Sequence, residues 1–228
     1  MDMMDKTINK QEIVVEKIDE CVEKSKVKAY DFVKRGIDII LGITGLTLCL
    51  PLFVIIALLI KIDSKGPVFF KHTRVGKNGK VLKMYKFRTM VDNAEDLIKK
   101  FTPEQKKEFE KNFKLENDPR VTRVGKILRK TSLDELPQII NILKGEMCII
   151  GPRPIIETEL EKYGKNKAKF LSVAPGLTGY WAANGRSDLS YEERMALELY
   201  YVDHRSLWLD LKIFVKTIGS VLTGRGAK

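Results

Sequence analysis

Cysteine and histidine are both scarce in this sequence. Its 228 residues include three cysteines, Cys21, Cys49 and Cys148, which are widely spaced and form no C-x-x-C motif. An odd number of isolated cysteines argues against a disulfide framework and a cysteine metal site, and favours a reducing, cytosolic setting. With only His72 and His204, a histidine-rich zinc centre is not expected. Both are interpreted as ordinary surface or core residues.

Several familiar nucleotide-binding and hydrolase motifs are also missing. The sequence has no G-x-x-x-x-G-K-[ST] loop and no G-x-G-x-x-G, so it predicts neither a P-loop nor a Rossmann turn. It has no Asp-x-Asp pair of the kind found in metal-dependent, two-lobed glycosyltransferases, and no G-x-S-x-G elbow. Any chemistry must therefore come from residues outside these motifs.

Positive charge is in excess. The chain carries 41 Lys and Arg against 30 Asp and Glu, which gives a net charge of +11 and a pI near 9.4. This balance indicates an anionic partner, and nucleic acid, anionic lipid and a phosphorylated substrate all satisfy it. A hydrophobic content of 44% is enough for one domain with a core and a small appendage.

The longest uncharged segment runs from Ile39 to Ile60, about 22 residues, which is enough for one membrane-spanning helix. It lies too far from the N-terminus for a signal peptide and has no small-residue cleavage site. Pro51 stands near its middle and predicts a kink, because it lacks an N–H and clashes with the carbonyl of Thr47. Each half is then roughly 16 Å long as a helix, or half of a hydrocarbon core.

Positive charges flank this run on both sides. They are Lys24, Lys26, Lys28, Lys34 and Arg35 before it, and Lys61, Lys65, Lys71, Arg74 and Lys77 after it. Since the positive-inside rule then acts on both ends, we expect a re-entrant helix that returns to the cytoplasmic face. The hydroxyls of Thr44 and Thr47 are candidates to satisfy the freed carbonyl. A single kinked spanning helix and a buried core helix are the alternatives.

The remaining segments predict a β-hairpin and several helices. Residues 1–29 are polar with a weak helical stripe, and form either an interfacial or partner-binding helix or a frayed extension. The stretches VFFKHTRV and KVLKMYKF flank Asn78-Gly79, the turn dipeptide of a hairpin. Helices are predicted at about 94–113, 131–143, 191–203 and 207–222. The third begins with a capping box from Ser190 to Glu193, and the amphipathic fourth lies at the membrane interface or packs on the core.

One acidic pair, Asp134 and Glu135, is surrounded by cations. Ser132-x-x-Glu135 has capping-box spacing at the expected start of a helix, which is a structural explanation for the pair. The nearby cations are Arg120, Arg123, Lys126, Arg129, Lys130 and Arg153. Cations keep a carboxylate ionised and suited to nucleophilic attack, and arginines bind diphosphates. Contact between these cations and lipid headgroups is the alternative.

Six segments resemble, in order, the blocks of the bacterial sugar transferase family of monotopic phosphoglycosyl transferases. They are DFVKRGIDIILGITGLTLCLPLF, GPVFFKHTRVGKNGK, YKFRTM, DPRVTRVGKILRKTSLDELPQIINILKGEMCIIGPRP, APGLTGYWAANGR and SLWLDLKIFVKTI. The resemblance extends from about Asp31 to Ile218 and leaves out the first 30 residues. It implies a transferase that moves a sugar-1-phosphate from a UDP-sugar to polyprenyl (undecaprenyl) phosphate, the first membrane step of polysaccharide or glycoconjugate synthesis.

The resemblance also implies roles for individual residues. Asp134 would attack the β-phosphorus and expel UMP in a ping-pong mechanism, and Glu135, with Asp134, would hold Mg²⁺. The phosphate-binding cations would be Lys86, Arg88, Arg129 and Arg153, and Thr178, Trp181 and Arg186 would contact nucleotide or sugar. Pro51 matches the helix-breaking proline of the family. Leu50 stands where relatives often have serine, and Ala182 where they usually have glutamine.

These inferences together predict an α+β, mostly helical, monotopic membrane protein. Its expected parts are a variable extension (1–29), a re-entrant helix (30–61) and a catalytic domain (62–228) on the cytoplasmic face of the bacterial inner membrane. The expected partners are a UDP-sugar, polyprenyl phosphate, anionic lipid and downstream glycosyltransferases, with no nucleic acid. A non-catalytic polybasic membrane adaptor is the alternative. No residue identifies the donor sugar.

Overall fold

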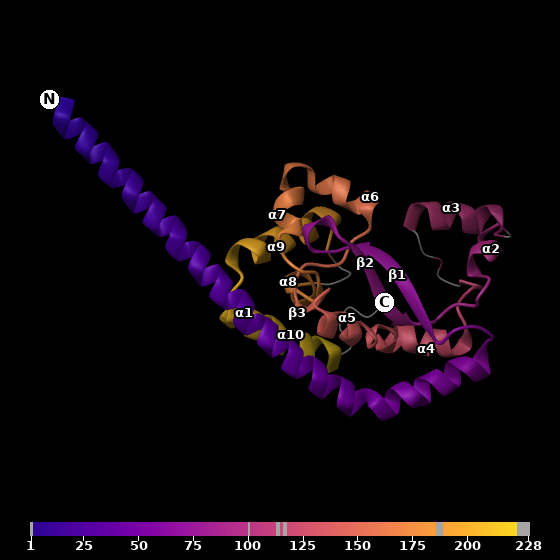
Figure 1. Cartoon of the computed structure of the whole chain (residues 1–228). Coiled ribbons are helices and arrows are strands. Elements are labelled where there is room, and N and C mark those ends of the chain that lie inside the picture. Colours follow the sequence, from indigo (N-terminus) through magenta and orange to yellow (C-terminus); the bar gives the residue numbers. More distant parts are fainter. Residues whose placement is uncertain (1, 100, 113–114, 116–117, 186–188, 223–228) are drawn as a thin grey trace.

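The computed structural model of the chain is mostly helical, with two small sheets among the described residues (Figure 1). Residues 2–99, 101–112, 115, 118–185 and 189–222 are described. The first half contains α1 (Asp2–Asp63), β1 (Phe69–Val75), η1 (Lys77–Gly79), β2 (Val81–Phe87), α2 (Ala94–Ile98), α3 (Pro103–Asn112), α4 (Arg123–Thr131), η2 (Leu133–Glu135) and α5 (Gln138–Lys144). The second half contains β3 (Cys148–Ile150), α6 (Glu157–Leu160), η3 (Glu161–Asn166), α7 (Lys167–Leu171), β4 (Gly176–Thr178), α8 (Tyr180–Ala183), α9 (Tyr191–His204) and α10 (Leu207–Leu222).

Helix α1 is a single long helix that is clearly bent, and its N-terminal part projects away from the other elements (Figure 1). Pro51 lies inside the helix and gives a physical reason for a bend, because it removes one hydrogen bond. The Thr47 hydroxyl donates to the carbonyl of Ile43 at 2.9 Å, and is therefore engaged one turn before the carbonyl that Pro51 frees. The expectation that Thr47 satisfies that carbonyl is wrong.

The apolar part of α1 is only partly covered by protein. Among the described residues, the segment Val27–Asp63 is long and apolar enough to cross a membrane, and 17% of its most apolar window is buried. Phe53, Ile56 and Ile60 face inward and pack in one cluster with Phe87 and Leu128. The opposite face exposes the side chains of Ile40, Ile43, Leu48, Leu50, Val54, Ile55, Leu58, Leu59 and Ile62. A face of this size and composition is suited to lipid.

The predicted hairpin is confirmed. Strands β1 and β2 pair antiparallel from Phe69 opposite Phe87 to Val75 opposite Val81. The Asn-Gly dipeptide lies in the short 3₁₀ turn η1, where Asn78 and Gly79 both have positive φ, 57° and 74°. Asparagine and glycine adopt this region at low cost, which explains why the turn forms there.

Asn141 of α5 joins the hairpin to the helical layer. It is fully buried, and its side-chain amide donates to the carbonyl of Lys83 at 2.9 Å and to the carboxylate of Glu146 at 2.7 Å. Its side-chain oxygen accepts from the N–H of Tyr85 at 2.9 Å. One side chain thus satisfies two backbone groups of β2 that point away from β1, and so fixes the position of the hairpin over α5.

Replacing Asn141 with alanine is expected to destabilise the fold by about 2–4 kcal/mol, because two buried backbone groups lose their partner. Thermal or denaturant unfolding of the full chain in detergent measures the loss. Asn93→Ala is the matched control, since Asn93 is exposed and makes no side-chain capping bond at the start of α2. A loss no larger than that of the control would contradict the assigned role.

The second sheet, β3–β4, is parallel and very short, and pairs Cys148 with Gly176 and Ile150 with Thr178. The backbone around it is packed too closely for side chains. A Cβ on Gly176 would lie 2.1 Å from the nitrogen of Gly151, and one on Gly179 would lie 2.1 Å from the oxygen of Gly151. These contacts hold the Gly-Pro-Arg-Pro loop, which contains Arg153, against the strand that precedes Trp181.

Two predicted helices are wrong in their bounds. The helix expected at 94–113 is divided into α2 and α3 because a new helix begins at Pro103, where the Thr102 hydroxyl accepts from the N–H of Gln105 at 3.2 Å. The helix expected at 131–143 begins only at Gln138. Helix α9 with its capping box from Ser190 to Glu193 and helix α10 at Leu207–Leu222 are confirmed. Trp208 on α10 is 64% exposed, as expected for an amphipathic helix.

Candidate active site

The acidic pair lies in the 3₁₀ turn η2, between α4 and α5, rather than at the start of a helix. Ser132 ends α4 in the left-handed conformation, with φ of 56°, which is uncommon for a residue other than glycine. Within the described part of the chain, Ser132 makes no side-chain capping bond, so the predicted capping box is wrong. Asp134 is buried (8% exposed), whereas the Glu135 side chain is 40% exposed.

Lys86 connects the hairpin to the acidic pair. Its ammonium nitrogen donates to Oε1 of Glu135 at 2.6 Å and lies 3.6 Å from Oδ2 of Asp134. Lys86 is 49 residues from Glu135 in the sequence. The two side chains meet because β2 packs against both η2 and α5. Lys86, which the resemblance assigns to phosphate binding, therefore lies at the acidic pair in a defined geometry.

The surroundings of Asp134 shift its pKa in opposite directions. Burial raises the pKa of Asp134 above its usual range, and the neighbouring charge of Glu135 acts in the same direction. The cations Lys86 and Arg129 act against this increase in the pKa of Asp134. A carboxylate that is poorly solvated and faces positive charge is more reactive toward phosphorus than one in water.

Arg129 reaches the site from α4. Its Nε donates to the Thr89 hydroxyl at 2.9 Å. Although much of the residue is exposed, partial desolvation of the guanidinium lowers the pKa of Arg129, and the charge of Asp134 opposes that decrease. Gly125, one turn earlier, allows the approach, because a Cβ there would lie 2.1 Å from the carbonyl oxygen of Thr89. Arg129 thus joins Lys86 as a cation whose charge acts on Asp134.

Arg88 makes its hydrogen bonds elsewhere. It is 6% exposed, and its Nη2 donates to the carbonyl and the hydroxyl of Ser64 at 2.8 and 2.9 Å. A Cβ on Gly66 would lie 2.0 Å from Nη1 of Arg88, so the guanidinium fills the space beside the end of α1. These bonds give Arg88 an anchoring contact at the junction of α1 and the hairpin; its predicted role in phosphate binding stays a prediction.

Arg153 is held by a buried carboxylate. Its backbone N–H donates to Oε1 of Glu198 at 3.3 Å, and its guanidinium lies 5.3 Å from the centre of the Trp181 ring. Glu198 is 1% exposed and also accepts a hydrogen bond from the Tyr163 hydroxyl. The predicted residues Arg153 and Trp181 are therefore in contact. The Thr178 hydroxyl instead lies 3.1 Å from that of Thr217, and Arg186 lies outside the described residues.

Sequence reasoning missed two arginines that lie near Arg153. Arg74 of β1 and Arg194 of α9 each have a guanidinium nitrogen 3.6 Å from a carboxylate oxygen of Glu159. The signal for Arg74 was present in the strand alternation, because it pairs with the buried Leu82 and so points inward. For Arg194, the helical segment alone gave no comparable signal.

The carboxylates of the site fit a hard divalent cation only in part. Among the described residues, no group of three or more His, Cys, Asp and Glu side chains could hold a metal. Asp134 and Glu135 supply two neighbouring carboxylates, which suits Mg²⁺, since this ion is commonly held by one or two carboxylates with phosphate oxygens and water. The donor set therefore fits a metal that binds together with a phosphorylated substrate.

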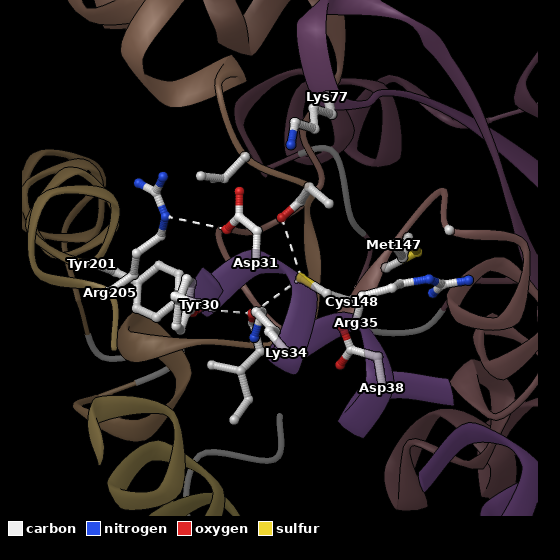
Figure 2. Close-up of a pocket in the computed structure, with 14 residues that line it drawn as sticks. Tyr30, Asp31, Lys34, Arg35, Asp38, Lys77, Met147, Cys148, Tyr201 and Arg205 are labelled. Carbon is white, nitrogen blue, oxygen red and sulfur yellow. Dashed lines mark hydrogen bonds and ion pairs between the residues drawn. The ribbon is translucent and has the colours of Figure 1, made fainter. Parts of the chain in front are cut away.

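A cavity elsewhere in the structure lies where α1 meets β3 and α9 (Figure 2). Its lining includes Tyr30, Lys34, Cys148 and Tyr201, and does not include the acidic pair. Beside it, the Asp210 carboxylate accepts hydrogen bonds of 2.7 Å from Lys34, 2.9 Å from Tyr30 and 2.8 Å from Tyr201. This buried network ties α1 to α9 and α10, and we assign it an anchoring role.

Comparison with known proteins places this geometry in context. The model of the family described as bacterial sugar transferase matches residues 29–224. The exopolysaccharide production protein ExoY of Rhizobium meliloti is 45% identical over 197 residues, which cover 85% of this chain and 87% of that protein. The undecaprenyl-phosphate galactose phosphotransferase of Salmonella typhimurium is 44% identical over 199 residues, 86% of this chain. The chain spans only 42% of that relative's length, and 42% of the UDP-galactose-lipid carrier transferase of Erwinia amylovora.

Proposed function

Because this chain belongs to the bacterial sugar transferase family, we propose that it transfers a sugar-1-phosphate from a UDP-sugar to undecaprenyl phosphate and releases UMP. The observation that carries the proposal is the buried Asp134 beside Glu135, with Lys86 between the two carboxylates. This cluster lies within the segment that the family matches. The transfer would be the first membrane step of polysaccharide or glycan assembly.

The proposed chemistry is a double displacement at one phosphorus atom. A carboxylate oxygen of Asp134 attacks the β-phosphorus of the UDP-sugar, and the bond from that phosphorus to the bridging oxygen breaks. UMP leaves with the electron pair, and a sugar phosphate remains on the carboxylate. An oxygen of the lipid phosphate then attacks the same phosphorus, which breaks the bond to Asp134, restores the carboxylate and gives a lipid diphosphate sugar.

The charges around Asp134 support this sequence of steps. Burial leaves the carboxylate poorly solvated, and Lys86 and Arg129 favour its ionised form. Asp134 and Glu135 would hold Mg²⁺, which, when bound, offsets the negative charge of the diphosphate. Lys86, with Arg153 held by Glu198, would position the phosphate oxygens.

The bent helix α1 supports a re-entrant arrangement in the membrane. Lysines and arginines precede and follow its apolar segment, and Pro51 lies within that segment, so both ends are suited to the cytoplasmic face. In this arrangement the exposed residues of α10, including Trp208, would rest at the same interface. The acidic pair would then open toward lipid-borne phosphate at the inner membrane of a bacterial cell.

Release of UMP tests the function directly. The full chain in lipid nanodiscs is supplied with Mg²⁺, undecaprenyl phosphate and each of several UDP-sugars, and UMP is measured. At least one donor is expected to give UMP at steady state, and without the lipid acceptor the same donor should release about one UMP per protein. UMP that appears only with acceptor would exclude the covalent intermediate. No UMP from any donor would favour the polybasic membrane adaptor instead.

A further inference from the structure

Three arginines from distant parts of the chain lie close to one another. Arg74 comes from β1, Arg153 from the loop after β3 and Arg194 from α9. Glu159 of α6 lies 3.6 Å from Arg74 and 3.6 Å from Arg194. We refer to Arg74, Arg153 and Arg194 as the arginine cluster. Of these three, only Arg153 is a site residue that the family resemblance implies.

The arginines of the cluster are only loosely paired with carboxylates. Glu159 lies 3.6 Å from two of the three guanidiniums, and both separations are longer than a hydrogen bond. The other carboxylate, Glu198, is occupied by Tyr163 and by the backbone of Arg153, and burial raises the pKa of Glu198. Buried cations of this kind are unfavourable unless an anion pairs with them.

Several donors of the cluster are buried without a hydrogen bond. Nε of each of the three arginines, together with Nη2 of Arg194, has no hydrogen-bond acceptor among the residues that the structure describes. A buried N–H without an acceptor costs about 1–3 kcal/mol. Four such donors in one cluster indicate a site that an oxyanion completes, because guanidinium groups bind phosphate through paired N–H donors.

Arg74 of the cluster and Lys86, beside the acidic pair, lie on the same face of the hairpin. Burial, together with the charges of Arg74, Lys86 and Arg153, lowers the pKa of His72 to about 4, so His72 is neutral between them. In the hairpin, Arg74 is four residues from Phe70, which pairs with Lys86. Four residues of strand correspond to about 13 Å. The long side chains of Arg74 and Lys86 span much of that distance. The Glu135 charge also acts on Arg74.

We propose that Arg74, Arg153 and Arg194 form an anion subsite that binds the phosphate of the leaving nucleotide while Asp134 attacks the adjacent phosphorus. This inference rests on the proposed function. Glu159 acts as an internal counter-ion that competes with the phosphate for the same guanidiniums. The positive charge of the subsite stabilises the negative charge that develops on UMP as it leaves.

The phosphate group of the acceptor lipid is a second ligand of the same chemical kind. In a double displacement, the attacking phosphate enters from the side that the leaving phosphate vacates. The phosphate of the polyprenyl acceptor therefore passes near the same arginines in the second step. Separate binding measurements with UMP and with farnesyl phosphate, a short polyprenyl phosphate, distinguish the two ligands.

Binding of UMP and of uridine to the full chain in nanodiscs tests the subsite. Arg74→Gln and Arg194→Gln are each expected to weaken UMP binding at least about tenfold, since each removes a charged phosphate contact. Uridine binding should be unchanged, because uridine lacks the phosphate. Arg205→Gln is the matched control: Arg205 is also a partly buried arginine near a carboxylate, 3.8 Å from Asp31, but it lines the other cavity. Thermal unfolding of each variant monitors folding.

Glu159→Gln provides a test with the opposite sign. Glu159 accepts a hydrogen bond from the backbone N–H of Ile156 at 3.3 Å. Glutamine keeps an oxygen for this bond but removes the charge that competes with phosphate. UMP binding is expected to become several-fold tighter. If the arginines serve only to hold Glu159, this variant will not bind UMP more tightly, and that result would overturn the subsite.

Two other outcomes would also overturn the nucleotide assignment. One is UMP affinity in both arginine variants equal to that of the unmodified chain. The other is weaker binding of farnesyl phosphate with unchanged binding of UMP, which would make the cluster an acceptor site. Failure of the proposed function gives a different result, since the unmodified chain would then release no UMP from any donor.

Discussion

Replacing Asp134 with asparagine is expected to reduce UMP release by about 10⁴-fold or more, the scale seen when a covalent nucleophile is removed. Asparagine has nearly the same shape but no ionised oxygen, so the attack on phosphorus loses its nucleophile. The rate of UMP release in nanodiscs with donor, acceptor and Mg²⁺ measures the loss. Asp134 is buried, and the amide fits the same volume, so the fold should be retained.

The control for this variant is Asp96→Asn. Asp96 is also paired with a lysine, Lys99 at 2.9 Å, but its side chain is 68% exposed and lies on α2. The control should keep full activity. Mass spectrometry of the unmodified chain, incubated with donor but no acceptor, should find a sugar phosphate on the peptide that contains Asp134. Asp134→Asn that kept a tenth of the activity would show that another group is the nucleophile.

Local features of the fold could be predicted from the sequence. The hairpin depends on Asn78-Gly79, and α9 depends on the box from Ser190 to Glu193, which are signals contained within a few residues. The bounds of α10 follow from its amphipathic period. The same logic failed at Ser132, because its spacing from Glu135 matches a capping box while its backbone is left-handed and ends α4. Short-range spacing alone does not distinguish these two roles.

The candidate site was only partly predictable, for a different reason. Asp134, Glu135 and Arg129 are close in sequence, and Lys86 was predicted from the family pattern; the structure brings all four together. The arginine cluster depends on contacts between β1, α6 and α9, which no periodicity encodes. The bonds from Arg88 to Ser64 also depend on a contact between distant segments, which its motif does not indicate.

Removing divalent metal is expected to abolish UMP release, because the diphosphate and the two carboxylates would otherwise place several negative charges together. Chelation with EDTA should reduce activity to background, and added Mg²⁺ should restore it. Lys86 supplies a counter-charge from the protein itself, at 2.6 Å from Glu135 and 3.6 Å from Asp134. A lysine offers one positive charge, which is not enough once a diphosphate enters.

The variant Glu135→Gln tests whether the need for a divalent metal depends on Glu135. Glutamine keeps a neutral oxygen but removes the charge that attracts the metal, so the Mg²⁺ concentration for half-maximal activity should rise about 10- to 100-fold. Glu157→Gln on the exposed surface of α6 should leave it unchanged. If Glu135→Gln lowered the maximal rate without changing the Mg²⁺ dependence, Glu135 would act on Lys86 or Asp134 rather than on the metal. The Mg²⁺ titration therefore separates a metal ligand from a residue that only positions Lys86.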